Sequence, residues 1–444
     1  MVLLTRSWRT VPDQKIFCNS PWYELHIYWD GSLGICCQED HKLYSSDQHY
    51  NIATMTIKDW FNSEPVREFR QSLLDHQRVS ACVRCYRDED AGANSRRIRN
   101  NQKSVIYTAA FDESFNQSPG HQKFITSIQD GYAESLPIDL HIDLGNYCNL
   151  ACKMCSAQAS STIAVQQVKW GIESSRQYIG TDWTRNDQVW DNFLQQLLDL
   201  PALNNIHFMG GETLLTNRFE QLVDFFIQHK KFELCFSFVT NGTVFKPQLL
   251  NKLKQFRRVG IEVSIETVDE HNAYQRQGTD TTAVLNNIKH YHEQCNGTNI
   301  TVTLRPAISA LTIGYHVGLL RYALAHELIV KSNWVYSPKF LNVAVLPRQV
   351  KNTYILQYQE LLAELPARVA GQDYNASDTA NCVDVIREHA RACVNALLAP
   401  DQTELFPQLV AHCQQWDQVY GYDVRSLYPE WTEILEQHGY TISS

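Results

Sequence analysis

The chain has 444 residues, of which 44% are hydrophobic, and its formal net charge at pH 7 is −9. This length suffices for two or three domains with packed cores, whereas no stretch offers the roughly 18 to 20 consecutive apolar residues of a membrane span and no basic run would follow a phosphate backbone. We therefore expect a globular protein with no membrane and no nucleic acid among its partners. The start of the chain lacks the pattern of a secretory signal, so the expected location is the cytoplasm.

The first predicted unit is a β-hairpin over residues 19–38, in which apolar side chains alternate on both sides of the turn-forming pair Asp30-Gly31. Residues 56–77 have apolar positions near helical spacing, and two cysteines follow. We expect the hairpin, the helix and these cysteines to form one α+β domain over residues 1–91.

The next segment, residues 92–135, is polar and rich in Asn, Gln and Ser, which predicts a connector on the surface. From residue 136 to residue 345, short apolar runs alternate with helical patterns. The runs predict six strands: Ile138–Leu144, Asn205–Met209, Leu234–Val239, Gly260–Ile265, Asn299–Leu304 and Ser332–Tyr336.

Strands that alternate with helices predict an α/β fold with a parallel sheet and right-handed crossovers, here a partial (β/α)6 barrel of the TIM type. In such barrels the chemistry lies at the carboxyl ends of the strands. Residues 346–444 contain several stretches with helical spacing and predict a helical C-terminal region.

Thirteen cysteines are many for a cytoplasmic chain, where disulfides rarely persist and thiolates more often bind metal or carry out redox chemistry. Three of them, Cys148, Cys152 and Cys155, lie in the loop after the first predicted barrel strand. Three thiolates on a four-iron cluster leave one iron free to bind and activate a small molecule, which would make these residues catalytic as well as metal ligands. The alternatives are a zinc site, which usually takes four ligands, or three unrelated buried thiols.

This cysteine spacing, with Met154 before the third cysteine, resembles the defining motif of the radical S-adenosylmethionine (SAM) superfamily. The resemblance implies a [4Fe-4S] cluster whose free iron binds SAM through its amino and carboxylate groups. After the second predicted strand, Gly210, Gly211 and Glu212 resemble the family's GGE segment, where glycine lets the backbone approach the SAM amino group.

The ends of the third and fourth predicted strands continue the resemblance. Thr240 and Asn241, followed by glycine, match a TNG segment of the cofactor pocket. By the resemblance, Ser264 contacts the SAM ribose and Arg276 its carboxylate, for which a planar guanidinium is well suited. Glu266 stands where relatives often have Asp-Gly, so its contact stays open, and a surface carboxylate is the alternative.

The N-terminal cysteines Cys18, Cys36, Cys37, Cys82 and Cys85 resemble an auxiliary cluster domain of the SPASM type in its shorter, twitch form. The resemblance implies a second [4Fe-4S] cluster, closed by four thiolates, that relays electrons or supports the structure. Only one of Cys36 and Cys37 is expected to be a ligand. Strand alternation groups Cys37 with the apolar residues before it, whereas the spacing favours Cys36; a four-cysteine zinc site is the alternative.

The remaining five cysteines have no metal-ligand spacing and are expected to be buried as small hydrophobic side chains, with a radical-quenching thiol as the less favoured interpretation. The aromatic stretch Trp416–Trp431 is expected to pack against the barrel rather than to meet substrate.

The resemblance implies reductive cleavage of SAM to a 5′-deoxyadenosyl radical and, within the twitch-bearing groups, modification of a ribosomally made precursor peptide. One such group, the spliceases, excises a tyramine equivalent at a Tyr-Gly site and leaves an α-keto-β-amino acid. It implies three partners: the precursor peptide, a separate small precursor-binding protein, and an electron donor of the flavodoxin or ferredoxin type. The rival interpretations are peptide epimerisation, thioether or carbon–carbon crosslinking, a small-metabolite reaction, and a noncatalytic iron–sulfur or zinc-binding protein.

Overall fold

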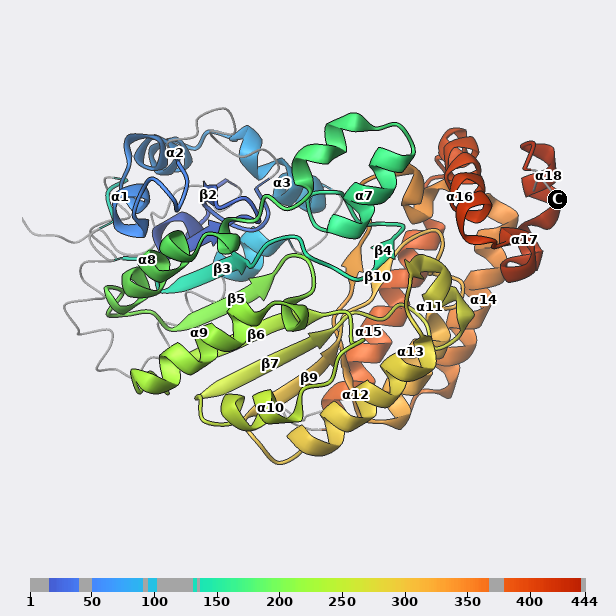
Figure 1. Ribbon diagram of the computed structural model, residues 1–444. Coiled ribbons are helices and arrows are strands. Elements are labelled where there is room, and N and C mark those ends of the chain that lie inside the picture. Colours follow the sequence, from blue (N-terminus) through green and yellow to red (C-terminus); the bar gives the residue numbers. More distant parts are fainter. Residues whose placement is uncertain are drawn as a thin grey trace, which may run out of the picture. The chain divides into compact units, whose positions relative to one another are not determined.

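The computed structural model describes residues 16–39, 50–90, 95–101, 131–133, 136–366 and 379–440. Most of the predicted connector therefore lies outside the described residues. Eight strands form the main sheet in the order β11-β9-β7-β6-β5-β3-β1-β2, with helices between the strands along the chain (Figure 1). The predicted α/β class is confirmed.

The chain divides into two compact units. The first comprises Met1–Tyr147, Gln177–Ser237 and Gln255–Arg257, and the second comprises Cys148–Arg176, Phe238–Lys254 and Arg258–Ser444.

In the first unit, β1 (Glu24–Ile27) and β2 (Leu33–Gly34) form the predicted antiparallel hairpin. Gly31 takes a φ of +83° in its turn, a conformation that glycine adopts without strain. Strand β1 also pairs in parallel with β3 (Asp139–Asp143), which pairs with β5 (Asn205–Met209). The hairpin therefore extends the main sheet instead of folding apart from it.

The N-terminal helical pattern is divided into α1 (Ile57–Phe61) and α2 (Glu64–Leu74), because Pro65 starts a new helix in its first turn. Helix α3 (Val83–Asp90) carries Cys85, and residues 96–101 are helical.

One face of the strands of this unit is apolar, and the opposite face is polar. Helices α8 (Asp187–Leu198) and α9 (Asn217–Gln228) supply buried aromatic side chains, and the rings of Phe208 and Phe219 lie 5.0 Å apart. The alternate positions of β1, β3 and β5 carry His26, His141 and His207, which lie opposite one another in register.

In the second unit, β7 (Arg258–Val263), β9 (Ile300–Leu304) and β11 (Ile329–Val330) pair in parallel. The first five predicted strands are confirmed as β3, β5, β6 (Cys235–Thr240), β7 and β9.

The sixth predicted strand is present but lies outside the main sheet. Residues in Ser332–Tyr336 form β12 (Asn333–Trp334), which pairs with β10 (Ala307–Ile308) in a separate two-stranded sheet. The sixth position of the main sheet is taken by β11, where the amide of Lys331 already donates to the carbonyl of Leu304. A two-residue strand is too short to show the alternation on which the prediction depended.

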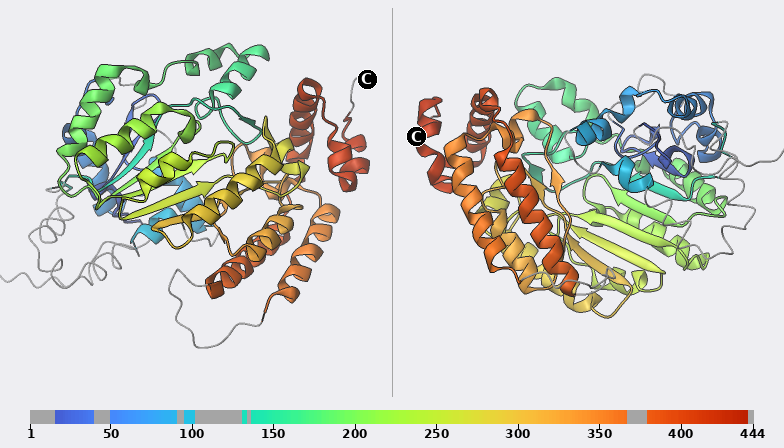
Figure 2. Two further views of the ribbon diagram at one scale, coloured as in Figure 1. Left: turned by 60° about the horizontal axis from the view of Figure 1, so that its bottom comes forward. Right: turned by 180° about the vertical axis from the view of Figure 1, so that it is seen from behind.

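The helices between these strands position the loops at their ends. They are α7 (Ser161–Lys169), α10 (Pro247–Leu253), α11 (Glu270–Gln275), α12 (Thr281–Cys295) and α13 (His316–Ala325). The helical C-terminal region is confirmed as α14 (Arg348–Glu364), α15 (Thr379–Leu398), α16 (Phe406–Tyr420), α17 (Val424–Leu427) and α18 (Thr432–Gln437). Helices α14 and α15, drawn in orange and orange-red, pack side by side (Figure 2).

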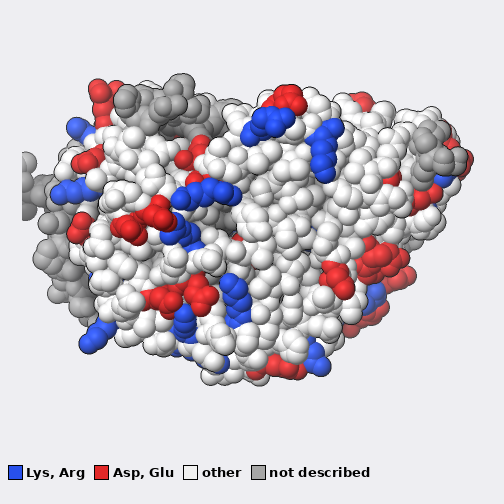
Figure 3. All heavy atoms as spheres, viewed as in Figure 1, with Lys and Arg blue, Asp and Glu red and all other residues white. Residues whose placement is uncertain are grey.

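On the face of the molecule drawn in Figure 3, Lys and Arg side chains are interspersed with Asp and Glu. Among the described residues, no helix combines the length and the apolar character needed to cross a membrane.

Candidate functional site

The loop that follows β3 carries Cys148, Cys152 and Cys155, and all three belong to the second unit. Cys152 lies in the two-residue strand β4 (Ala151–Cys152), which pairs antiparallel with β8 (Arg276–Gln277). This pairing places Cys152 opposite Arg276. The loop is also tied to the start of α7, because the hydroxyls of Ser160 and Thr162 donate to the carbonyls of Leu150 and Cys148 at 2.8 and 2.6 Å.

The thiols of this loop are largely removed from solvent. Cys148 and Cys152 are buried and Cys155 is half-buried. Burial raises the pKa of Cys155 to about 11 and that of Cys152 further, with the negative charge of each neighbouring thiolate adding to the effect. The thiolate is the form that binds a metal, so metal binding here would release protons. The donor set therefore fits a cluster that neutralises the thiolates.

Arg276 and Glu266 form a buried ion pair beside this loop. The guanidinium donates to both carboxylate oxygens, at 2.5 and 2.8 Å, and its Nη1 lies 3.7 Å from the Sγ of Cys152. Burial opposes the charge of Arg276, but Glu266 outweighs burial and raises its pKa. Glu266 is fully buried and also accepts from the amide of Ala307, so the surface-carboxylate interpretation was wrong.

The ends of β6 and β7 lie beside the same loop. The side-chain amide of Asn241 donates to Oδ1 of Asn149 at 2.8 Å and lies 4.0 Å from the Sγ of Cys148. The amide of Ser264 donates to the carbonyl of Thr240 at 2.8 Å. The structure thus brings Asn241 to the segment that carries the three cysteines, and it places Ser264 beside Thr240, the residue before Asn241.

Gly210, Gly211 and Glu212 lie in the first unit, against the segment that leads into Cys148. Both glycines have positive φ, and a Cβ on Gly211 would stand 2.3 Å from the carbonyl oxygen of Tyr147. The amide of Glu212 donates to this same oxygen at 2.7 Å. The glycines are therefore required by a close approach to the protein backbone, a reason that the sequence did not reveal.

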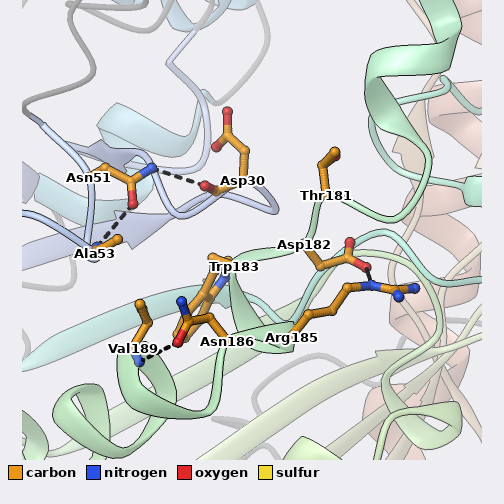
Figure 4. A pocket seen from close by; sticks show the side chains of 9 residues that line it. All are labelled: Asp30, Asn51, Ala53, Thr181, Asp182, Trp183, Arg185, Asn186 and Val189. Atoms are coloured by element: carbon orange, nitrogen blue, oxygen red, sulfur yellow. Dashed lines mark hydrogen bonds and ion pairs between the residues drawn. The ribbon is translucent and has the colours of Figure 1, made fainter.

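Asp182, which also bonds the segment before Cys148, lines a cavity of about 420 Å³ in the first unit (Figure 4). Asp182 accepts from the amide of Asn146 at 2.7 Å and pairs with Arg185 at 3.1 Å. Sequence reasoning missed Asp182, because nothing in its surroundings marks it as a neighbour of Asn146. The cavity is lined by Asp30, Asn51, Ala53, Thr181, Asp182, Trp183, Arg185, Asn186 and Val189.

Two further residues were missed although they lie inside the cysteine motif. Asn149 bonds Asn241, and also donates to the hydroxyl of Thr243 at 3.1 Å. Lys153 is buried, and burial lowers its pKa to about 8. Met154 receives a contact from the side-chain amide of Gln275, 3.5 Å from its sulfur. The sequence did contain one signal for Asn149 and Lys153, because both are polar residues that lie between predicted cluster ligands.

In the first unit, Cys18, Cys36, Cys82 and Cys85 line one cavity, together with Arg96 and Arg97. Burial raises the pKa of Cys18 to about 11 and raises that of the other three thiols as well. Four thiols around one space are the donor set of a [4Fe-4S] cluster or of zinc. Within the described ranges, no three His, Cys, Asp or Glu side chains converge closely enough to hold a single metal ion.

Cys37 does not line this cavity. Burial raises the pKa of its thiol, but the neighbouring His141 and Arg96 outweigh burial and lower it to about 6. The geometry thus groups Cys36, and not Cys37, with the other three cysteines. The five cysteines without metal-ligand spacing, Cys235, Cys295, Cys382, Cys393 and Cys413, are all buried.

Each of the two cysteine groups lies in a range that matches a known family. Residues 142–307 match the radical SAM superfamily, and residues 18–86 match the SPASM iron–sulfur cluster-binding domain. The two ranges contain every predicted cluster ligand. A comparison with curated proteins found no match.

Several solved structures are similar in part. anSMEcpe with bound AdoMet is 16% identical with a TM-score of 0.39, over 51% of this chain and 61% of that one. SuiB of Streptococcus suis bound to S-adenosylmethionine is 13% identical with a TM-score of 0.35, over 55% and 48%. SuiB bound to the precursor peptide SuiA is 14% identical with a TM-score of 0.37, over 66% and 63%. The chain thus spans between 48% and 63% of the length of these structures.

Proposed function

We propose that this chain, which carries a radical SAM domain and an N-terminal SPASM-type iron–sulfur domain, is a radical SAM enzyme that modifies a ribosomally made precursor peptide. The observation that carries the proposed site is the grouping of Arg276 and Asn241 around the loop of the three cysteines. A zinc-stabilised binding protein would need the thiols but not these polar side chains.

In this proposal, each site residue of the second unit has a specific role. Cys148, Cys152 and Cys155 hold the SAM cluster and leave one iron open. Arg276 is oriented by Glu266 and binds the SAM carboxylate. Ser264 binds the ribose, and Asn241 fixes the loop through Asn149. When bound, the cluster and SAM supply the 5′-deoxyadenosyl radical that removes a hydrogen atom from an unreactive C–H bond.

In the first unit, we propose that Cys18, Cys36, Cys82 and Cys85 hold the auxiliary [4Fe-4S] cluster. Four thiolates close its coordination, so it relays electrons or supports the structure. Our proposed division of the chain is a twitch-like domain over residues 1–91, a connector over 92–135, a radical SAM partial barrel over 136–345 and a helical region over 346–444.

The peptide substrate is supported by the description of SuiB, which was solved with a precursor peptide. Within this class we propose excision of a tyramine equivalent at a Tyr-Gly site, with a separate small precursor-binding protein and a flavodoxin or ferredoxin as electron donor in the cytoplasm. Epimerisation or crosslinking of the peptide would use the same SAM site, and so would a small-metabolite reaction.

SAM cleavage is tested by reconstituting the protein anaerobically with iron and sulfide, reducing it, adding SAM and measuring 5′-deoxyadenosine. We expect 5′-deoxyadenosine from the loaded, reduced protein only. A fully loaded and reduced sample that forms none would contradict the proposed function.

The bond change is tested by mass spectrometry of a precursor peptide encoded beside the gene, after incubation with the enzyme, SAM and reductant. Loss of a tyramine equivalent supports excision. An unchanged mass with inverted stereochemistry, or loss of two hydrogens, would indicate epimerisation or crosslinking instead.

A further inference from the structure

Lys153 follows Cys152 directly in the cluster loop, and only 2% of it is exposed. Its amide donates to the carbonyl of Gln275 at 2.9 Å, and its Nζ donates to the carbonyl of Tyr274 at 2.6 Å. The backbone and the side chain of Lys153 are therefore both bound to the residues that precede Arg276.

Three aromatic rings surround the ammonium group of Lys153. The distances from Nζ to the ring centroids are 3.6 Å for Tyr274, 5.1 Å for Trp416 and 5.4 Å for Tyr422. The Tyr274 and Tyr422 rings meet edge to face at 5.3 Å. We name Tyr274, Trp416 and Tyr422 the aromatic cage.

Two members of the aromatic cage come from the C-terminal region, Trp416 from α16 and Tyr422 from the turn before α17. Both lie beyond residue 307, where the match to the radical SAM superfamily ends. Trp416 is itself held by a stacked contact with Tyr420 at 5.4 Å and an edge contact with Trp170 at 5.2 Å. The cage is thus a packed part of the second unit.

An ammonium group taken out of water needs replacement contacts, and a carbonyl with aromatic faces supplies them. The strength of these contacts depends on where Nζ lies, so the cage restricts the position of Lys153. Because Lys153 is joined to Cys152, and Cys152 lies opposite Arg276 in the β4–β8 pair, the restriction extends to the thiol and to its 3.7 Å contact with the guanidinium.

We infer that Lys153 is a positioning residue of the SAM cluster, through which the C-terminal aromatic cage fixes the segment Cys152–Cys155. The inference rests on the proposed role of these cysteines as cluster ligands. By this inference, the aromatic stretch of the C-terminal region positions the cluster loop in addition to packing against the barrel.

The test compares Lys153→Met with wild type and with Lys169→Met, an exposed lysine of the same unit, by redox titration followed by electron paramagnetic resonance. Methionine is an unbranched side chain only one atom shorter than lysine, and it removes the charge. We expect a lower reduction potential for the SAM cluster in Lys153→Met and an altered spectral change on adding SAM, because a positive charge near the thiolates stabilises the reduced cluster. The auxiliary cluster is the internal reference and should not shift.

The cage is tested with Trp416→Leu. We expect a smaller shift in the same direction, because the ammonium remains but is no longer held in place by the ring. A double variant should shift no further than Lys153→Met alone, because Trp416 acts through Lys153. A potential and a SAM response that are unchanged in Lys153→Met, or shifts that add in the double variant, would overturn the inference. If Lys153→Met lost both clusters, Trp416→Leu would decide alone, with the shift supporting the inference and its absence overturning it. A wild-type protein whose spectrum does not respond to SAM would contradict the proposed function instead.

Discussion

The two cysteine groups differ in what holds them in place. The thiols of Cys148, Cys152 and Cys155 lie in one short loop that is tied down by α7, by the β4–β8 pair and by Lys153. The four thiols of the auxiliary cavity come from three segments, those of Cys18, of Cys36 and of Cys82 and Cys85, and meet only when the N-terminal part has folded. We therefore expect the first group to respond to changes in its immediate surroundings, and the second to depend on the fold of its domain.

The largest effect should come from removing a loop thiol. Cys152→Ala is expected to abolish SAM cleavage and to remove the signal of one cluster, because two thiolates do not hold the four irons. Assay of 5′-deoxyadenosine and of iron checks this. Cys295→Ala changes a buried cysteine without metal-ligand spacing and is the control. It should keep both SAM cleavage and the iron content. Residual cleavage in Cys152→Ala would exclude this residue as a ligand.

The choice between the adjacent cysteines gives the next largest effect. Cys36→Ala should lose about half of the iron, that of the auxiliary cluster, whereas Cys37→Ala should keep it. Iron analysis of the two variants, purified side by side, provides the comparison. The opposite result would make Cys37 the ligand and would mean that the cavity rearranges when the cluster binds.

The ion pair beside the loop is expected to matter for stability. Glu266→Gln leaves the buried guanidinium of Arg276 without its counter-charge, and breaking such a pair typically costs about 3 kcal/mol of the free energy of unfolding. Chemical denaturation measures this cost. The exposed pair of Arg321 and Glu364 is the control, and Glu364→Gln should change little, because water screens it. Equal effects of both substitutions would show that burial of the Glu266 pair is unimportant.

The smallest expected effect concerns the glycines of the first unit. Gly211→Ala should destabilise the protein by about 1 to 3 kcal/mol, since a methyl group meets the carbonyl of Tyr147 and an alanine is strained at positive φ. Gly171→Ala has the same strain, with φ at +86° and open space around it, and should cost less. Thermal unfolding of the two variants separates the clash from the strain. Equal costs would mean that the backbone approach at Gly211 is not tight.

Much of the fold was readable from local patterns. The hairpin around Asp30-Gly31 and the strands β3 to β9 of the main sheet follow from alternation and turn residues, and each of these signals lies within a few neighbouring positions. The pairing of β1 with β3 and the exchange of β12 for β11 could not be predicted, because pairing depends on contacts between residues far apart in the chain.

The candidate site divides in the same way. The sequence by itself determined the thiols of the cluster loop, the glycine pair and the strand ends around Ser264 and Asn241, because each is a spacing of particular residue types. Only the tertiary structure decided that Glu266 is the buried partner of Arg276, that Cys36 joins the auxiliary cavity, and that Lys153 is held by Trp416. These are contacts across long sequence separations, and the sequence contains no local pattern for them, since burial and proximity arise only when the chain has packed.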